Sequence, residues 1–254
     1  MIILKIGGSL ITKKDSEEPK VDFENLGRIC REISGHNGKL VLIHGAGSYG
    51  HPIVKRTGIH EGIKNKQNLF DFSETQILQN ELNSIVCREL LKNKIPAMPM
   101  QASFSAIMES KKLKYLDVEA IKNMVEMGVV PVLFGVPAYD SLQKCSILSG
   151  DQIITYLADK LNAKIMIHAT DVDGVFDLDP KKNPNAKLIE EINDNSFLKF
   201  ISGSSNTDVT GGMFGKVKEL LESKISSIII NGNIEGRIKK ALLYQNVTGT
   251  LIKK

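Results

Sequence analysis

Residues 39–51 read KLVLIHGAGSYGH, an apolar run that passes directly into a glycine-rich loop bracketed by two histidines. A short apolar run bounded by a glycine cluster is typical of a buried strand. The loop spells out G-x-G-x-x-G at Gly45, Gly47 and Gly50, a spacing that dinucleotide-binding proteins use after their first strand. The stretch therefore predicts a strand that ends in an anion-binding loop, and the surrounding sequence must decide the kind of anion.

The dinucleotide alternative lacks the rest of its context. A Rossmann loop enters a helix at once and is followed, about 20 residues on, by an acidic residue that ends the next strand. Here Pro52 and KRTGIHEG (55–62) intervene, and a helical pattern starts only near Asp71. A Walker loop fails because TGGMFGKV (210–217) has valine where Ser or Thr should bind magnesium, and DVDGVFDLDP (171–180) lacks the glutamate that completes a calcium loop.

Strand and helix patterns alternate along the whole chain. Apolar runs predict strands at 1–8, 39–45, 95–101, 129–135, 164–170, 226–232 and 248–252. Helical spacing of apolar residues predicts helices at 21–35, around 78–90, and at 118–128, 149–163, 210–224 and 235–243. Such alternation predicts an α/β fold with a largely parallel central sheet, whose ligands bind beyond the carboxyl ends of the strands.

Composition limits the classes of function. The 254 residues are 42% apolar, enough for one large domain with a buried core. A net charge of +4 without clustered basic residues does not favour nucleic-acid binding. Cys30, Cys87 and Cys145 lack disulfide or zinc spacing, and no stretch approaches the roughly 20 apolar residues of a membrane span. We therefore expect a cytoplasmic protein that binds neither nucleic acid nor membrane.

Lysines accompany the glycine loops. Lys5, Lys14 and Lys216 lie beside glycine-bearing junctions, where exposed backbone amides suit bound phosphates. Lys5 is the most informative, because a charge inside an apolar strand is costly unless it is paired. We expect it to point at an anion near the strand end. The alternatives are a solvated edge-strand lysine for Lys5 and plain surface lysines for the other two.

Five motifs in this order resemble the amino acid kinase superfamily: KIGGS (5–9), HGAGSYGHP (44–52), SGDQ (149–152), TDVDGVF (170–176) and TDVTGGMFGKV (207–217). The second histidine, directly after the glycine loop, narrows the resemblance to the isopentenyl phosphate kinase family. The likeness spans essentially the whole chain.

This resemblance implies an αβα sandwich that forms a single domain over residues 1–254 and assembles as a homodimer. The N-terminal lobe, about 1–148, would bind the acceptor, and the C-terminal lobe, about 149–254, the nucleotide. The implied activity transfers the γ-phosphoryl group of ATP to isopentenyl phosphate and gives isopentenyl diphosphate and ADP, in an alternative mevalonate route. Mg²⁺ would be carried on the ATP phosphates, and no dedicated protein metal ligands are expected.

The resemblance also assigns site residues. Lys5, Lys14 and His51 would be catalytic, with Lys14 stabilising the transition state and His51 donating to the acceptor's phosphate. Ala46 and Gly150, together with His51, would bind the acceptor. The residues expected to bind ATP are Lys5, Ile6, Gly7, Gly8, Gly47, Asp171, Phe176, Asp177, Leu178, Asp179, Pro180, Lys181, Gly212 and Lys216.

The chemistry agrees with a phosphate acceptor. A phosphomonoester has its second pKa at about 6, so near pH 7 it is already a dianionic nucleophile and needs no general base. Catalysis must then come from positioning and from cations around the transferring group. His44 is expected to be structural, and His36, His60 and His168 have no assigned role. The acceptor's tail is expected among apolar side chains of the helix at 77–86.

Two other functions stay open from the sequence. A kinase acting on another small phosphate or phosphonate, such as a fosfomycin-type kinase, would also use a phosphate-binding histidine. A noncatalytic nucleotide-binding or storage protein on the same scaffold is the third possibility, because a fold alone does not fix a function.

Overall fold

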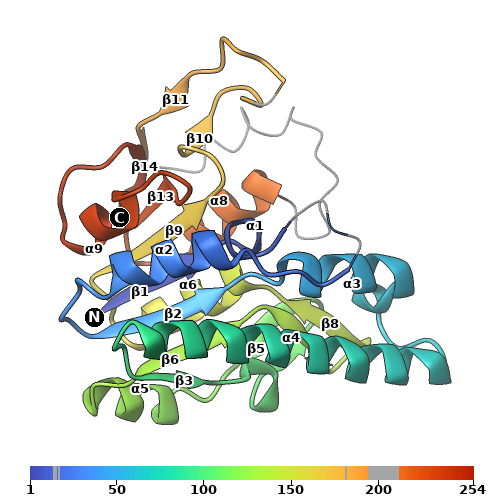
Figure 1. Cartoon of the computed structure of the whole chain (residues 1–254). Coiled ribbons are helices and arrows are strands. Elements are labelled where there is room, and N and C mark those ends of the chain that lie inside the picture. Colours follow the sequence, from blue (N-terminus) through green and yellow to red (C-terminus); the bar gives the residue numbers. More distant parts are fainter. Residues whose placement is uncertain (14–15, 17, 181, 194–211) are drawn as a thin grey trace.

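The computed structural model describes residues 1–13, 16, 18–180, 182–193 and 212–254. At its centre lies an eight-stranded sheet in the order β12-β14-β13-β9-β1-β2-β6-β3 (Figure 1). Its strands are β1 (Ile2–Ile6), β2 (Leu40–His44), β3 (Ala97–Pro99), β6 (Val130–Phe134), β9 (Ile165–Thr170), β12 (Glu191–Ile192), β13 (Ser227–Asn231) and β14 (Gly249–Ile252). All pairs are parallel except β13–β14, which confirms the prediction of a largely parallel sheet.

Helices cover both faces of this sheet, because successive residues of each strand point to opposite sides. In β1, Leu4 and Ile6 face one apolar layer, whereas Ile3 faces the other. The first layer includes α1 (Gly8–Ile11), α2 (Phe23–Ile33), α4 (Lys66–Lys92) and α9 (Arg237–Leu242). The second includes α5 (Glu119–Glu126), α6 (Gly150–Lys160) and α8 (Gly212–Glu222). The three-layer αβα sandwich is thus confirmed, and no helix among the described residues could cross a membrane.

The two halves of the chain share this one sheet. Strands β12, β14, β13 and β9 come from residues after 148, and β1, β2, β6 and β3 come from residues before it. The two sets meet where β9 pairs with β1. Because β1 has β2 on its other side, the strand order reverses there, and ligands of open α/β sheets bind outside the carboxyl ends of strands at such a point.

Local signals fixed where helices begin. The Asp22 side chain accepts a hydrogen bond from the Asn25 amide at the start of α2, and Ser149 does the same for Gln152 at the start of α6. The long helix α4 begins at Lys66 rather than near Asp71, because the Asn65 side chain caps a first turn that has no apolar pattern.

The sequence did not predict two β-structures outside the central sheet. One is a four-stranded sheet of β5 (Lys112–Tyr115), β4 (Ile107–Glu109), β7 (Val136–Asp140) and β8 (Lys144–Leu148). The other is a hairpin of β10 (Val175–Phe176) and β11 (Leu188–Ile189), which projects at the top of Figure 1. The β7–β8 hairpin joins β6 to α6 and so lies beside the carboxyl end of the central sheet.

Candidate active site

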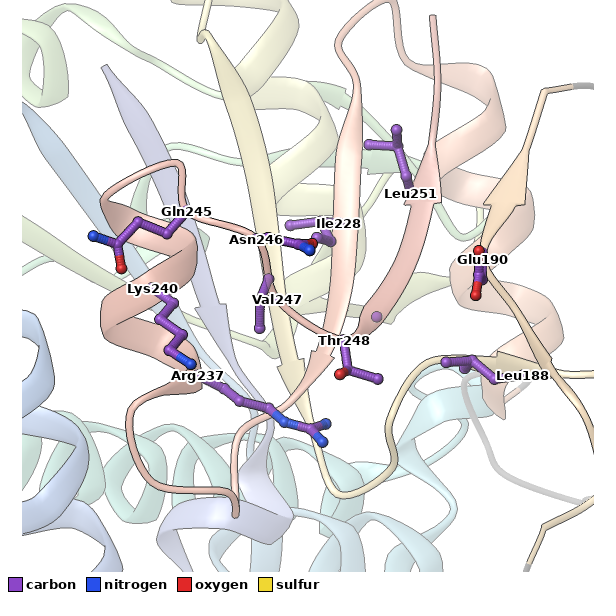
Figure 2. A pocket seen from close by; sticks show the side chains of 11 residues that line it. Leu188, Glu190, Ile228, Arg237, Lys240, Gln245, Asn246, Val247, Thr248 and Leu251 are labelled. Carbon is purple, nitrogen blue, oxygen red and sulfur yellow. The ribbon is translucent and has the colours of Figure 1, made fainter.

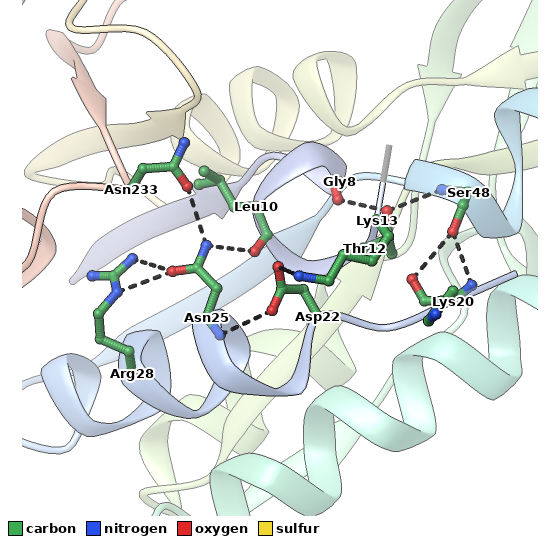
Figure 3. A network of polar contacts seen from close by, with 10 residues as sticks. All are labelled: Gly8, Leu10, Thr12, Lys13, Lys20, Asp22, Asn25, Arg28, Ser48 and Asn233. Atoms are coloured by element: carbon green, nitrogen blue, oxygen red, sulfur yellow. Dashed lines mark hydrogen bonds and ion pairs between the residues drawn. The ribbon is translucent and has the colours of Figure 1, made fainter. Parts of the chain in front are cut away.

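Two glycine loops lie backbone against backbone at the ends of β1 and β2. A Cβ on Gly8 would lie 2.3 Å from the Gly47 amide nitrogen, and one on Gly45 would lie 2.5 Å from the Gly8 nitrogen. Gly47 also has a φ of +52°, a backbone conformation that residues with a side chain rarely adopt. Thr12 joins the loops: its hydroxyl donates to the Gly8 carbonyl at 2.9 Å and accepts from the Ser48 amide at 3.0 Å (Figure 3). Only glycine permits this approach.

An ionic centre lies beside these loops. The Asp151 Oδ1 atom, in the first turn of α6, lies 3.1 Å from Lys5 Nζ on β1 and 2.8 Å from Lys216 Nζ on α8. The side chains are only 16%, 10% and 11% exposed, respectively. Lys5 is therefore a buried lysine on a central strand, and the edge-strand alternative is wrong. Within the protein, the counter-ion of Lys5 is the Asp151 carboxylate, which the sequence did not identify.

Burial and charge set the protonation states of this centre. Burial by itself would raise the pKa of Asp151, but Lys216 and Lys5 outweigh it and hold that pKa well below its usual value. Burial lowers the pKa of Lys5 to about 8, helped by Lys216 and opposed by Asp151. Burial also lowers the pKa of His168 to about 4, although its Nδ1 lies 3.5 Å from Asp151 Oδ1. A neutral imidazole, one carboxylate and two cations make the centre net positive near neutral pH.

A pocket of about 90 Å³ opens next to the ionic centre. One part of its wall combines charged groups and loop backbone: Lys5, Gly45, Ala46, Gly50, His51, Ser149, Gly150 and Asp151. The remaining wall is largely apolar: Val54, Thr75, Gln79, Gly135, Val136, Pro137 and Ile147. The structure thus brings all three predicted acceptor residues, Ala46, His51 and Gly150, to one pocket with Lys5. Gly150 packs closely on the Lys5 side chain, since a Cβ there would lie 2.8 Å from Lys5 Cε.

The apolar side chains of residues 77–86, where the acceptor's tail is expected, do not line this pocket. Ile77 is 60% exposed and faces away from the core. From α4 only Thr75 and Gln79 line the pocket, and both are polar. The apolar side chains come instead from α3 (His51–Thr57) and the β7–β8 hairpin, as Val54, Val136, Pro137 and Ile147.

The residues predicted to bind ATP lie on several elements. Ile6, Gly7, Gly8 and Gly47 occupy the ends of β1 and β2, and the Gly7 amide donates to the Ala169 carbonyl at 2.8 Å. Asp171 follows β9, whereas residues 176–180 run from β10 into the connection to β11. Gly212 begins α8, and from that helix the structure brings Lys216 to the ionic centre. Lys14 and Lys181 lie outside the described residues, so the structure does not place them.

The two histidines of the loop have different surroundings. His44 is fully buried, its ring nitrogens lie 3.0 Å from the Gly45 carbonyl and 3.2 Å from Asn83 Oδ1, and its ring stacks on Phe134. This agrees with the structural interpretation, and burial lowers its pKa to about 4. His51 is exposed at the start of α3 and lines the pocket.

Sequence reasoning missed Asp151 and His168. An acidic residue in a helix's first turn is expected from the helix dipole alone, so Asp151 gave no distinctive signal. His168 pairs in register with Lys5 across β9 and β1, a neighbourhood that only the strand order reveals. The hint that the sequence did offer was that Lys5 and His168 are polar residues within apolar strands.

A larger cavity lies away from this site. A space of about 570 Å³ lies between α9, the β13–β14 pair and β11 (Figure 2). Arg237 and Lys240 extend into this region from α9, and Arg237 pairs with Asp173 at 2.6 Å. None of the predicted site residues that the structure describes lines this cavity, whereas the smaller pocket holds the buried lysine and the glycine loops. We therefore assign the chemistry to the smaller pocket.

No group of three or more His, Cys, Asp or Glu side chains that could hold a metal ion occurs in the part of the chain that the structure describes. Asp151, the carboxylate nearest the pocket's cationic end, is already engaged by two lysines.

Comparisons with known proteins agree with this geometry. The model of the Amino acid kinase family matches residues 1–239. The isopentenyl phosphate kinase of Methanothermobacter thermautotrophicus is 44% identical, with 99% of this chain and 98% of the relative covered, and that of Methanocaldococcus jannaschii is 36% identical at the same coverage. A crystal structure of isopentenyl phosphate kinase is 40% identical with a TM-score of 0.88 over 99% of this chain and 100% of its own. The chain therefore belongs to the amino acid kinase family and, within it, to the isopentenyl phosphate kinases.

Proposed function

We propose that the protein is an ATP-dependent kinase that transfers the γ-phosphoryl group to the phosphate of isopentenyl phosphate, giving isopentenyl diphosphate and ADP. One observation carries the proposal. The buried Lys5 and Lys216 both form ion pairs with Asp151, at the cationic end of a pocket whose remaining wall is largely apolar. Such a pocket suits a small phosphate monoester with a short hydrocarbon tail. The names and full-length likeness of the relatives support the same acceptor.

The chain's own residues account for the chemistry. Two polyanions must approach each other, and the acceptor dianion needs no base, so the barrier is mainly electrostatic repulsion and misalignment. Lys5 lines the acceptor pocket and Lys216 reaches Asp151 from the nucleotide lobe, so their ammonium groups flank the place where the phosphates would meet. Backbone amides of the two glycine loops would hold phosphate oxygens, as anion-binding loops do.

The remaining assignments belong to the same proposal. Residues of about 1–148 bind the acceptor and those of about 149–254 bind ATP, with Lys14 stabilising the transition state. Mg²⁺, carried on the ATP phosphates, would neutralise part of their charge. His51 donates a hydrogen bond to the acceptor's phosphate, supported by its place in the pocket wall.

We also propose a cytoplasmic homodimer that serves an alternative mevalonate route. Large apolar side chains exposed on α4 and on the sheet's edge strand β3 support the dimer, namely Phe70, Ile77, Leu91 and Met98. Light scattering on the purified protein tests the assembly, and a monomeric mass at micromolar concentration would contradict it.

A substrate panel tests the activity. The protein is incubated with Mg·ATP and isopentenyl phosphate, fosfomycin, acetylglutamate or no acceptor, and ADP release and the ³¹P spectrum are followed. We expect a diphosphate only from isopentenyl phosphate. Turnover of fosfomycin without turnover of isopentenyl phosphate would overturn the proposal, and so would ATP binding without turnover of any acceptor.

The His51→Ala variant tests the acceptor role within the same assay. We expect a loss of about 10-fold or more in kcat/KM for isopentenyl phosphate and little change in the KM for ATP, because a hydrogen bond to a charged group is removed. His36→Ala, a change after α2 and away from the pocket, is the control. Equal losses for both substrates would contradict the assignment.

A further inference from the structure

The face of α4 that packs against the rest of the protein carries a polar stripe. Five polar side chains on this one helix are less than 9% exposed: Asn68, Asp71, Thr75, Gln79 and Asn83. Their spacing of three or four residues places them along one side of the helix. Buried polar groups are nearly always hydrogen-bonded in folded proteins, so each member of the stripe needs a partner.

Four members of the stripe have one. The Asn68 amide donates to Asp71 Oδ2 at 3.2 Å, and the Thr75 hydroxyl donates to the Asp71 carbonyl at 2.7 Å. The Asn83 amide donates to the Val132 carbonyl at 3.1 Å, while its oxygen lies 3.2 Å from His44 Nε2. These contacts tie α4 to itself and to the central sheet.

Gln79 is the exception. Its side chain is 1% exposed, and neither its amide nitrogen nor its oxygen has a hydrogen-bond partner within the described residues. It lines the acceptor pocket, one helical turn from Thr75. Its amide nitrogen packs on the Gly50 backbone, since a Cβ there would lie 2.1 Å away, and Gly50 directly precedes His51. The unpaired amide therefore lies beside the turn that presents His51 to the pocket.

We propose that Gln79 is an acceptor-binding residue whose side-chain amide donates a hydrogen bond to the phosphate of the bound substrate, next to His51. This inference rests on the proposed phosphate acceptor. An anion attracts the donor end of the amide, and a bound phosphate would supply the partner that the free protein lacks. A neutral donor also adds a contact at the acceptor without adding a third fixed charge to Lys5 and Lys216.

Two substitutions separate this role from a structural one. Gln79→Met keeps the volume and removes both polar atoms, and Gln79→Glu keeps the shape but turns a donor into a negative charge. Calorimetry measures the Kd of isopentenyl phosphate without nucleotide, steady-state kinetics measure both KM values, and thermal melts measure Tm. The same two substitutions at Gln245, an exposed residue of the loop before β14, are the matched control.

For Gln79→Met we expect acceptor binding to weaken about 10- to 100-fold, as for a lost hydrogen bond to a charged group. The KM for ATP should change less than about two-fold, and Tm should stay the same or rise, because an unpaired buried amide is replaced by an apolar group of similar shape. Gln79→Glu should bind the acceptor still more weakly, since the carboxylate repels the dianion. The Gln245 variants should resemble the unmodified protein.

The outcomes distinguish this inference from the proposed function. Unchanged acceptor binding in Gln79→Met would overturn the inference, and so would a lowered Tm with equal losses for both substrates, which indicates a structural amide. If the unmodified protein binds isopentenyl phosphate without turnover, the proposed activity fails, while the Kd values of the variants still decide the role of Gln79. If it does not bind isopentenyl phosphate, both fail.

Discussion

The ionic centre makes a quantitative prediction about Asp151→Asn. The substitution keeps the shape of the side chain and removes the charge that two buried ammonium groups share, at 3.1 Å from Lys5 and 2.8 Å from Lys216. Asparagine can still accept one hydrogen bond, but it leaves two cations close together with no counter-ion between them. The perturbation is therefore almost purely electrostatic.

The distances set its size. At an effective dielectric constant of about 20, the attractions of Asp151 to Lys5 and Lys216 are about 5 and about 6 kcal/mol. Neutralising the carboxylate also removes its own desolvation penalty, so the net loss should approach the roughly 3–5 kcal/mol measured when one partner of a buried pair is removed. For a domain of this size that corresponds to about 6–20 °C in Tm. Displaced lysines should also lower kcat about 100-fold.

Urea unfolding with and without saturating ATP tests the reasoning. ATP phosphates supply negative charge to the same lysines, so ATP should stabilise Asp151→Asn more than it stabilises the unmodified protein. Asp159→Asn is the control on the same helix, because Asp159 Oδ1 only accepts from Ser223 and the Lys224 amide, a role that asparagine can keep. A loss below about 1 kcal/mol for Asp151→Asn, or equal stabilisation of both proteins by ATP, would refute the assignment.

Three further predictions follow from single residues. Because the pKa of Lys5 is lowered to about 8, its positive charge is lost as pH rises, and kcat/KM for ATP should fall above about pH 8. In Lys5→Arg this fall should move to higher pH. If it stays at the same pH in the variant, Lys5 is not its source. Gly8→Ala should lower Tm and activity together, because its Cβ would lie 2.3 Å from the Gly47 nitrogen, and an unchanged melt would contradict the close packing. In the folded protein the pKa of His168 is lowered from 6.5 to about 4. Between these pH values the unfolded chain binds a proton at His168 that the folded protein does not. The free energy of unfolding should therefore drop as pH falls from 6.5 to 4. His168→Leu should reduce that drop in urea melts recorded between pH 4 and 6.5, and an identical pH dependence would count against a buried neutral imidazole.

Much of the fold was readable from the sequence because its signals are local. Apolar runs identified most strands of the central sheet, and Asp22 and Ser149 marked helix starts that the structure confirms. The five motifs, taken together in their order along the chain, also led to the correct family. The β7–β8 hairpin was missed, because its short strands lie between a predicted strand and a predicted helix without a distinctive pattern.

Partnerships between distant residues were decided only by the tertiary structure. Lys5 in an apolar strand showed that some anion had to be near, but nothing local distinguished Asp151 from other acidic residues in first helical turns. The pairing depends on α6 and α8 meeting the central strand β1 near its carboxyl end. An ion pair is worth several kcal/mol only when folding both buries it and brings its charges to about 3 Å. Gln79 shows the same limit: its sequence position predicts a helix residue, whereas the unpaired amide beside His51 exists only because α4 packs there against the loop of residues 44–51.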